Sequence, residues 1–541
     1  MTLALDHIFA DGMILQREKL VRVWGTAGPG QTVEVGIQGQ TAAVVTDADG
    51  RWCCELAPLH ASEGEALIVR ADDESIELTD VVVGEVFVAG GQSNMEFWIR
   101  YDRDVEAARL TCTNPRIRFY DVPKCSYPGQ LNDFDFSEVG VWRKATPEDL
   151  DRFSAVGYYF ARVLEEELDV PVGIVGCNYG GTISSAWMRA DHAAEVDPEQ
   201  VAGFEAKLAG HTYVELLAAG GLNAAKNDKG YTIWPAWNEF FLPRTPTQDD
   251  IVAFMAEEAA KAAGSADVGG LEIGSVSSGA DSQIDPALLT PTKEAPGSLF
   301  TYMVLPIAGF AARGVLWYQG ESDDEFDGAQ WRYADAMRAI MADWREVWDD
   351  ATLPFLVVQL PGFGDWMGLG PNDYVTIRAC QQQATDADPH AWLCSIGDVG
   401  DEHDIHPKVK QPVGERLALL ALRHLYGCDV LADAPRATGA TCHGKRVEVT
   451  FEHASDGLTV EGDTINALEV LVDGVPASFV ARAEGDRLVI ELTDMPSGDV
   501  CIRFAQTNWY CVNLYNSAHI PALPFKRSCG KAARSWAESR S

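Results

Sequence analysis

The sequence predicts an α/β fold, in which helices cover both faces of a parallel sheet and β-rich domains flank it at both ends of the chain. Three observations lead to this prediction. From about residue 84 to 426, apolar strands alternate with amphipathic helices, which is the pattern of a parallel sheet. Residues before and after this stretch form short alternating runs without a useful helical period. The 541 residues are enough for two to four domains at about 100–200 residues each.

We expect three domains: a β-sandwich-like domain at 1–82, an α/β domain at 83–428 and a β-rich domain at 429–541. The two outer domains consist of short strands separated by Gly, Pro and Asp clusters. Examples are Val21–Trp24, Thr32–Gly36 and Ala66–Arg70 in the first, and Arg446–Phe451, Leu468–Val472 and Arg487–Leu492 in the last.

Within the α/β domain, each predicted helix is accompanied by apolar strands. The helix over Phe153–Asp169 has apolar residues at helical spacing and is followed at once by a strand. The predicted strands are Gly84–Gly90, Val170–Gly176, Gly314–Tyr318, Phe355–Leu360 and Ala391–Ile396, and the other helices are Gln330–Val347 and Val409–Tyr426.

An insertion interrupts this order at about 195–298. Its part at 245–296 is rich in Ala, Gly, Ser and Asp and has few large apolar side chains. We expect a helix over Asp250–Ala263, and weak order elsewhere or order only by docking on the rest of the protein.

The composition excludes several classes of partner. Lys and Arg total 42 and Asp and Glu total 81, so the net charge is −39. This charge repels phosphate groups, and we therefore expect no nucleic-acid partner and no anionic membrane surface. The sequence has no run of about 18 apolar residues, so no membrane span is expected.

The N-terminus and the cysteines indicate a cytoplasmic protein. Met1–His7 lacks the basic start of a secretory signal. The twelve cysteines are therefore expected to be reduced and mostly buried thiols. None forms a Cys-x-x-Cys pair, so we expect neither a zinc site nor a redox site.

Four polar segments each come directly after a predicted strand. They are Gly90–Met95, Cys177–Ile183, Trp317–Asp323 and Asp401–Pro407. Taken singly, they also fit a polar turn, a tight turn, a core aromatic pair beside an acidic loop, and a hydrated loop. The last has clustered Asp and His residues, but their spacing matches no zinc pattern.

Taken together, the four segments favour acyl transfer. The carboxyl ends of parallel strands meet at one edge of a sheet, so the segments can converge there. Ser93 on a Gly-Gly turn suits a nucleophile, and a histidine of the fourth segment suits its base. The glycines of the second segment and the Gln319 amide offer N–H donors for an oxyanion. These groups complete the requirements of an acyl-transfer site.

The sequence resembles the sialate O-acetylesterase family of the SGNH (GDSL-like) hydrolase superfamily. The likeness covers roughly residues 10–195 and 298–525 and leaves out the insertion. The matching motifs are Leu15–Arg17, Val23–Gly25, Gly84–Phe87, Gly91–Met95, Phe153–Phe160, Gly180–Thr182, Ala186–Met188, Trp317–Ser322, Asp404–Pro407 and Asn513–Asn516.

The resemblance implies an SGNH-type sheet and hydrolysis of acetyl esters on sugar hydroxyls, with no metal and no cofactor. Carried over by motif, Ser93 is the nucleophile and His406 is the base. The oxyanion hole would be formed by the N–H of Ser93, a glycine N–H of Gly180 or Gly181, and Gln319, which stands where many SGNH enzymes have an asparagine.

The sequence departs from the superfamily at the residue that orients the histidine. An Asp often stands three residues before the His, but that position here is His403. We expect Asp404 to orient His406, and we keep Asp401, Asp398 and a backbone carbonyl as alternatives.

We expect the substrate to be an O-acetylated sugar, with O-acetylated sialic acid first. Acetylxylan or another plant glycan is the alternative within the esterases, and a non-catalytic carbohydrate-binding protein is the alternative of another class. Trp98, Trp187 and Trp317 are candidates for stacking on the sugar, although tryptophan is more often a core residue. The complete set of expected substrate contacts is Gln92, Asn94, Trp98, Trp187, Trp317 and Glu321.

Overall fold

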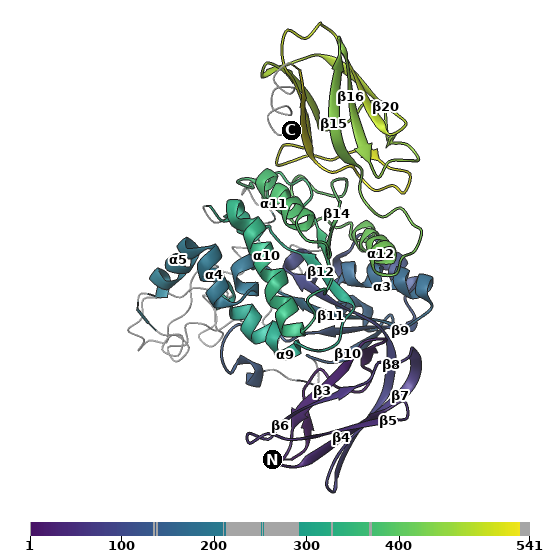
Figure 1. Cartoon of the computed structure of the whole chain (residues 1–541), viewed down its shortest axis with the longest axis vertical. Helices are drawn as coiled ribbons and strands as arrows, with labels where there is room; N and C mark the ends of the chain where they lie inside the picture. Colours follow the sequence, from purple (N-terminus) through teal and green to yellow (C-terminus); the bar gives the residue numbers. More distant parts are fainter. Residues whose placement is uncertain are drawn as a thin grey trace. The chain divides into compact units, whose positions relative to one another are not determined.

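The computed structural model describes residues 2–133, 136, 139–208, 210–211, 250, 253, 292–325, 328–366 and 370–530. The chain divides into two compact units, Met1–Phe355 and Leu356–Ser541 (Figure 1). The first unit contains the N-terminal strands, and the second contains the C-terminal ones.

The first unit begins with short strands, as the alternating pattern of residues 1–82 predicts. The side chains of one such strand alternate between exposed and buried, so that Trp52, Cys54 and Leu56 face the interior. One small sheet consists of β1 (Ala4–Leu5), β3 (Val21–Thr26) and β6 (Arg51–Leu56). Further antiparallel pairs join β4 (Thr32–Ile37), β5 (Gln40–Val45) and β7 (Ser62–Ala71).

A single long strand, β8 (Glu74–Gly91), runs from this β-rich region into the central sheet (Figure 1). Its first half pairs antiparallel with β7. Its buried second half pairs in parallel with β11 (Val172–Asn178) and β12 (Gly314–Tyr318). The predicted domain boundary at residue 82 therefore falls inside a strand.

The central sheet is mixed, which corrects the prediction of a parallel sheet. Strand β9 (Asn114–Asp121) continues the parallel order beside β11, and β2 (Ile14–Gln16) is also parallel to β8. However, β10 (Trp142–Ala145) is antiparallel to β9, and β7 is antiparallel to β8. The β7 pairing arises because β8 belongs both to the N-terminal strands and to the α/β core.

The helices of the first unit agree with the predicted pattern where the period is strong. Helix α3 (Ala155–Leu168) lies within the predicted range 153–169. The Ser154 hydroxyl accepts a hydrogen bond from the Gly157 N–H at its N-terminus, and Asp169 ends it at φ 50°. The other α-helices among the described residues of this unit are α1 (Ser93–Glu96), α2 (Val105–Thr111), α4 (Ala190–Val196), α5 (Pro198–Leu208), α9 (Leu305–Ile307) and α10 (Ala329–Trp348).

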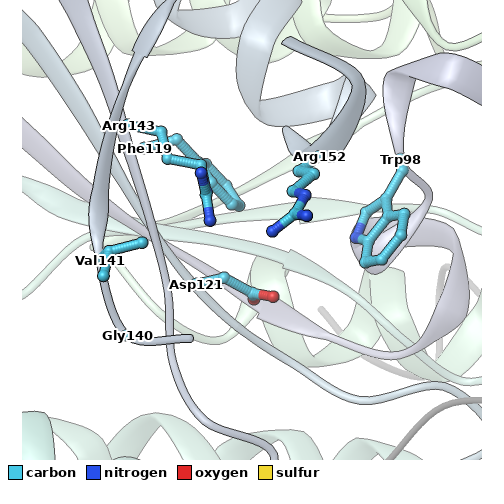
Figure 2. A pocket seen from close by; sticks show the side chains of 7 residues that line it. All are labelled: Trp98, Phe119, Asp121, Gly140, Val141, Arg143 and Arg152. Atoms are coloured by element: carbon cyan, nitrogen blue, oxygen red, sulfur yellow. The ribbon is translucent and has the colours of Figure 1, made fainter. Parts of the chain in front are cut away.

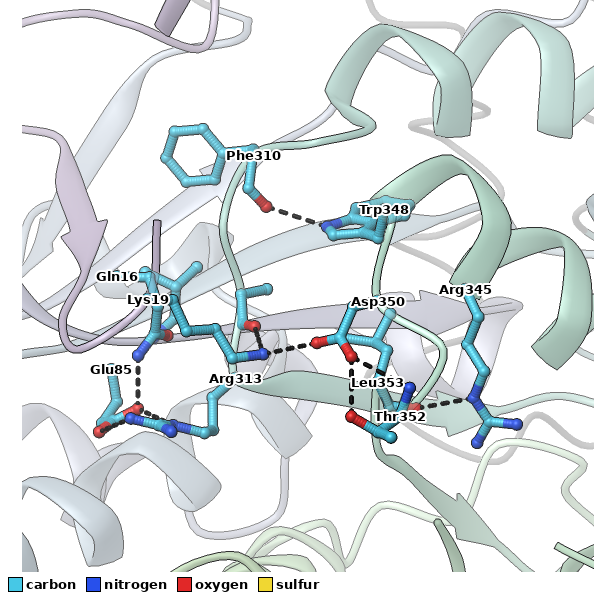
Figure 3. Close-up of polar contacts among 12 residues, drawn as sticks. Gln16, Lys19, Glu85, Phe310, Arg313, Arg345, Trp348, Asp350, Thr352 and Leu353 are labelled. Carbon is cyan, nitrogen blue, oxygen red and sulfur yellow. Dashed lines mark hydrogen bonds and ion pairs between the residues drawn. The ribbon is translucent and has the colours of Figure 1, made fainter. Parts of the chain in front are cut away.

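A buried carboxylate joins three distant segments of the first unit (Figure 3). Glu85 on β8 is fully buried and accepts hydrogen bonds from Gln16 at 2.9 Å, Arg17 at 2.7 Å and Arg313 at 2.8 Å. Burial alone would raise the pKa of Glu85, but these partners outweigh it and hold that pKa below its ordinary value. Leu15–Arg17 and Gly84–Phe87, two of the motifs on which the family resemblance rests, therefore lie in one cluster of charged side chains.

In its described residues, 356–366 and 370–530, the second unit contains the helices α11 (Tyr374–Asp386) and α12 (Gln411–Leu425) and a β-rich C-terminal region. Strand β14 (Ala391–Cys394) neighbours β13 (Phe355–Val358), which begins at the last residue of the first unit. The C-terminal strands form two four-stranded sheets and a short pair. These are β15 (Arg436–His443), β16 (Arg446–Glu452), β21 (Arg487–Leu492) and β20 (Phe479–Glu484); β19 (Val475–Pro476), β18 (Leu468–Val472), β22 (Val500–Phe504) and β24 (Phe525–Cys529); and β17 (Thr459–Val460) with β23 (Leu514–Tyr515).

One disulfide contradicts the expectation that all twelve cysteines are free thiols. Cys442 on β15 and Cys529 on β24 are bonded, with their Cα atoms 5.8 Å apart. The two residues are 87 positions apart in the chain. Their contact depends on how the strands pack, and no local spacing of cysteines in the sequence predicts it.

Most of the predicted insertion lies outside the described residues, and so does nearly all of the segment 250–263, where the sequence predicts a helix. Its described beginning contains α5. In the part of the chain that the structure describes, no helix has the length and apolar character needed to cross a bilayer.

Candidate active site

Ser93 lies at the turn between β8 and α1, where the sequence predicts a nucleophile. A side chain at the preceding Gly91 would place its Cβ 2.1 Å from the carbonyl oxygen of Tyr318, and Gly91 has a φ of +130°. Only glycine fits such a close approach at this φ. The Gln92 N–H donates to the same carbonyl at 3.0 Å, which fixes the start of the turn.

The Gly180–Gly181 turn follows β11 and lies against Ser93. A Cβ at Gly180 would be 3.2 Å from the Cβ of Ser93, so the two backbones are in close contact. Strands β11 and β8 are parallel, and Asn178 is in register with Gly91. The Gly180 N–H donates to Glu96 Oε2 at 2.7 Å, and Lys293 Nζ donates to the Gly180 carbonyl at 2.7 Å.

Gln319 follows β12, whose last residue, Tyr318, is in register with Gly91 on the other side of β8. The structure thus places three of the four predicted segments at the same ends of three adjacent parallel strands. The Gln319 side chain is fully buried, and its Nε2 donates to the Thr182 carbonyl at 3.0 Å and to Asp323 Oδ2 at 2.5 Å. Its Oε1 accepts from the Tyr333 hydroxyl at 2.8 Å.

Asp323 is a residue of this site that the sequence interpretation missed. Its buried carboxylate accepts from the Ser184 N–H at 3.0 Å and from the Ser184 hydroxyl, in addition to Gln319. Burial raises the pKa of Asp323 to about 6, although these hydrogen bonds oppose the shift. In the sequence Asp323 stands in an acidic run, which gave no sign that it would be buried.

Two of the predicted substrate contacts, Gln92 and Asn94, bind the loop after β12, and a third, Glu321, belongs to that loop. Gln92 Oε1 accepts from the Gly320 and Ser322 N–H groups, both at 3.3 Å. Asn94 Nδ2 donates to Glu321 Oε1 at 2.6 Å, and Gln92, Asn94 and Glu321 are all buried. These side chains therefore connect the serine turn to the Gln319 loop.

Two of the three predicted stacking tryptophans are core residues. Trp187 and Trp317 are fully buried, and their rings meet edge to face at 6.0 Å. This placement agrees with the core alternative that the sequence left open.

Trp98 is half-buried and lines a pocket with Phe119, Asp121, Gly140, Val141, Arg143 and Arg152. Figure 2 shows the Arg152 guanidinium and the Asp121 carboxylate in the space between the Trp98 ring and Arg143. Arg143 also pairs with Asp149 at 3.0 Å. The pocket thus combines an aromatic face with charged groups of both signs.

A buried lysine connects this pocket to the serine turn. Lys124 Nζ lies 3.4 Å from Asp121 Oδ1 and 3.6 Å from Glu96 Oε1, and it donates to the Asn178 carbonyl at 2.9 Å. Burial alone would lower the pKa of Lys124, but Asp121 and Glu96 outweigh it, so that pKa lies above its ordinary value. Lys124 therefore stays charged. The sequence gave no signal for it.

The fourth predicted segment lies in the second unit. His406 is 9% exposed, and its ring meets Trp366 edge to face at 5.5 Å. Burial, together with Lys408 and Lys410, lowers the pKa of His406 well below its ordinary value. A neutral imidazole can accept a proton, as a general base must. His403, in contrast, has a side chain that is 61% exposed and pairs with Asp365.

Asp404 is buried beside His406 but binds its backbone. Asp404 Oδ1 accepts from the His406 N–H at 2.8 Å, whereas it lies 3.9 Å from the imidazole Nδ1. Its Oδ2 pairs with Lys408 at 2.7 Å. Of the alternatives, Asp398 makes two bonds of 2.7 Å with Arg416, and Asp401 accepts from the His403 N–H at 2.9 Å.

Comparison with known proteins shows which proteins this chain resembles. Residues 293–422 match a family model described as carbohydrate esterase, sialic acid-specific acetylesterase. The chain is 23% identical to the sialate O-acetylesterase of Mus musculus over 95% of this chain and 92% of the mouse protein. It is also 23% identical to the Homo sapiens enzyme over 95% of this chain and 90% of the human one. The crystal structure of a carbohydrate acetylesterase from Xanthomonas citri superposes with a TM-score of 0.71 and 27% identity, covering 97% of this chain and 99% of that one.

These matches define the class of the protein, which is a carbohydrate esterase and hence a carboxylic ester hydrolase. Within this class, the relatives that match nearly the whole chain are sialate O-acetylesterases. The resemblance noted in the sequence is thereby confirmed.

Proposed function

We propose that this chain removes acetyl groups from sugar hydroxyls through Ser93, and that O-acetylated sialic acid is its substrate. The similarity to sialate O-acetylesterases along nearly the whole chain supports the activity and the sugar. The observation that carries the assignment of Ser93 is its position at the end of β8, with the Gly180 turn so close that a Cβ added at Gly180 would lie 3.2 Å from the Ser93 Cβ.

The reaction follows the chemistry of serine esterases. The Ser93 oxygen attacks the acetyl carbonyl carbon, and His406 accepts the hydroxyl proton. The carbonyl electron pair moves onto oxygen, where N–H donors stabilise the oxyanion. The intermediate then collapses, the sugar oxygen leaves with the proton from His406, and an acetyl-serine remains. Water, activated by the same histidine, hydrolyses it to acetate.

We assign the supporting roles as follows. The N–H of Ser93, a glycine N–H of the Gly180–Gly181 turn and Gln319 form the oxyanion hole. To donate there, the Gln319 amide has to give up its hydrogen bond to the Thr182 carbonyl or to Asp323. Asp404 orients His406 by holding its backbone N–H at 2.8 Å, which fixes the loop that carries the imidazole.

Trp98 is the aromatic residue proposed to contact the sugar, because its ring lines a pocket. The charged groups of the same pocket, Arg143 and Arg152 with Asp121, suit a polar sugar substituent. The other predicted contacts are buried, and we propose that they shape the loops around the substrate; they are Gln92, Asn94, Trp187, Trp317 and Glu321.

The test is acetate release from 9-O-acetyl sialic acid, acetylated xylo-oligosaccharides and acetylated pectin fragments. We expect the highest kcat/KM on acetylated sialic acid, and no release by Ser93→Ala. A higher kcat/KM on acetylated xylo-oligosaccharides would change the proposed sugar and leave the proposed reaction unchanged. Sugar binding without acetate release would show a non-catalytic carbohydrate-binding protein.

A cytoplasmic location remains a proposal, as does action without nucleic acid or membrane partners, which the net charge of −39 favours. Since disulfides are rare in the cytosol, the Cys442–Cys529 bond offers a direct test of the location.

A further inference from the structure

The turn of Gly180 and Gly181 is bound from two sides by side chains of opposite charge. Glu96 Oε2 accepts the hydrogen bond of the Gly180 N–H at 2.7 Å. Lys293 Nζ donates to the Gly180 carbonyl at 2.7 Å. Glu96 lies one helical turn after Ser93, and Lys293 comes from a segment 113 residues beyond Gly180. Both contacts therefore join the turn to separate parts of the first unit.

Lys293 fixes the orientation of the peptide between Gly180 and Gly181. The described chain contains no cis peptide, so the carbonyl of Gly180 and the N–H of Gly181 lie in one peptide plane and point in opposite directions. An ammonium group bound to the carbonyl thus holds the N–H of Gly181 in one direction. The cation also polarises the peptide, which makes that N–H a stronger donor.

The absence of a side chain lets Lys293 come this close. A Cβ at Gly181 would lie 2.9 Å from Lys293 Nζ, and Gly181 has a φ of +64°. The ammonium also lies 5.3 Å from the centre of the Tyr179 ring, which adds a cation–π contact. These contacts give the lysine head a defined place beside the turn.

Glu96 is held as firmly on the other side. Its second oxygen lies 3.6 Å from Lys124 Nζ, whose side chain is 4% exposed. Leaving the Gly180 N–H would take Glu96 away from a buried cation, which is unfavourable where the surroundings are poor in water. The Gly180 N–H is therefore committed to Glu96. In the described residues, the Gly181 N–H donates no hydrogen bond.

We propose that the N–H of Gly181, and not that of Gly180, is the glycine donor of the oxyanion hole, and that Glu96 and Lys293 are the positioning residues that aim it. This inference rests on the proposed esterase function. It names the one N–H of the turn that is available to a developing oxyanion beside Ser93. The opposing model is that Glu96 blocks a Gly180 donor in the resting enzyme and must leave during the reaction.

Two variants of Glu96 separate these models. Glu96→Gln keeps an oxygen that can accept from the Gly180 N–H, so we expect kcat within about threefold of the wild type. Glu96→Ala removes the acceptor and loosens the turn. Since the loss of one oxyanion donor lowers kcat by roughly 10²–10³, we expect a loosened donor to lower it at least about tenfold, with KM within a few fold. If Glu96 blocks the site instead, Glu96→Ala will keep or raise kcat, and the proposal is wrong.

Lys293 is tested in the same way. Lys293→Met should lower kcat about tenfold, whereas Lys293→Arg, which can still donate to the carbonyl, should recover most of the loss. Lys144→Met is the matched control, because it removes a lysine of the same unit that pairs with Asp80 instead. Equal kcat in Lys293→Met and the wild type would contradict the proposal, as would a loss that Lys293→Arg does not recover.

The assay uses the full chain with 4-nitrophenyl acetate and with the best acetylated sugar, and circular dichroism checks the fold of each variant. Wild type and Ser93→Ala are measured first. An inactive wild type, or an active Ser93→Ala, would disprove the proposed function itself. A functioning serine esterase whose Glu96 and Lys293 variants keep the wild-type kcat would overturn only the present inference.

Discussion

His406 and His403 stand three residues apart but have very different surroundings. His406 is 9% exposed, whereas the His403 side chain is 61% exposed and paired with Asp365. We expect His406→Ala to abolish most of the activity and His403→Ala to change kcat by less than about threefold, because an exposed ion pair contributes little. Acetate release by the two variants checks this expectation. If His403→Ala lost most of the activity and His406→Ala lost little, His403 would be the general base.

The pH dependence follows from the same burial. The pKa of His406 is lowered below 6.5, so the imidazole stays neutral to lower pH than a free histidine. The acid limb of the kcat/KM profile should therefore lie below pH 6.5. A limb above that value would indicate a different base.

The contacts of Asp404 depart from the usual arrangement of triads, and a substitution of this residue tests its role. Its carboxylate accepts from the His406 backbone N–H and pairs with Lys408. Asp404→Asn removes the charge that balances Lys408 and can lose the backbone bond, so we expect kcat to fall strongly, with about 10⁴ as the upper limit known from other triads. A loss below about tenfold would assign the orienting role to Asp401, Asp398 or a backbone carbonyl.

Gln319 is the third residue whose role can be measured directly. Gln319→Ala should lower kcat by roughly 10²–10³ and leave KM within a few fold, since an oxyanion donor acts in the transition state. Gln319→Glu should be worse, because its carboxylate would face Asp323, which now accepts from the amide at 2.5 Å. Gln40→Ala serves as control, because this half-buried glutamine lies on β5 and bonds the Ala57 backbone instead. If KM rose and kcat were spared, Gln319 would bind substrate instead.

At the scale of elements, the Glu85 cluster joins β2, β8 and the segment before β12. Glu85→Gln leaves Arg17 and Arg313 without their buried carboxylate. We expect the free energy of unfolding to fall by about 2–3 kcal/mol at pH 7, below the roughly 3–5 kcal/mol typical of a broken buried pair. The effect is reduced because the two arginine side chains are 18% and 19% exposed and can regain water.

Urea unfolding followed by tryptophan fluorescence measures this difference. Because the folded-state pKa of Glu85 lies below 4.5, its stabilising effect is present above that value and is lost as the pH falls through the folded-state pKa. The gap between wild type and Glu85→Gln should therefore narrow in acid. Glu55→Gln, which removes a half-exposed partner of Arg22, should change the free energy by less than about 1 kcal/mol.

The sequence predicted those elements whose signal is local. An apolar run that ends in glycine marked β8 and β11, and apolar residues at helical spacing over 153–169 marked α3. The contacts that complete the site have no such signal. Glu96 and Gly180 are 84 residues apart, Lys293 and Gly180 are 113 apart, and Ser184 and Asp323 are 139 apart. Only the packing of the strands brings these pairs together.

At the scale of the whole molecule, the state of the Cys442–Cys529 disulfide distinguishes an oxidising from a reducing environment. If Cys442 and Cys529 are bonded as in the structure, titration of the unfolded protein with a thiol reagent will find ten of the twelve cysteines free. Twelve free thiols in protein taken from its native cells would support the reducing cytoplasm. The bond closes a long loop, and so Cys442→Ser should lower the free energy of unfolding by about 2–4 kcal/mol relative to the oxidised protein.

Strand β8 also limits how this chain can be recombined with others. It enters the N-terminal sheet as a partner of β7 and leaves the central sheet at the serine turn, without a linker between the two. A genetic crossover near residue 82 would cut this strand. The new β8 would have to fit β7 in its first half and the strands of the central sheet in its second half. We therefore expect that the N-terminal region and the nucleophile can be exchanged only together.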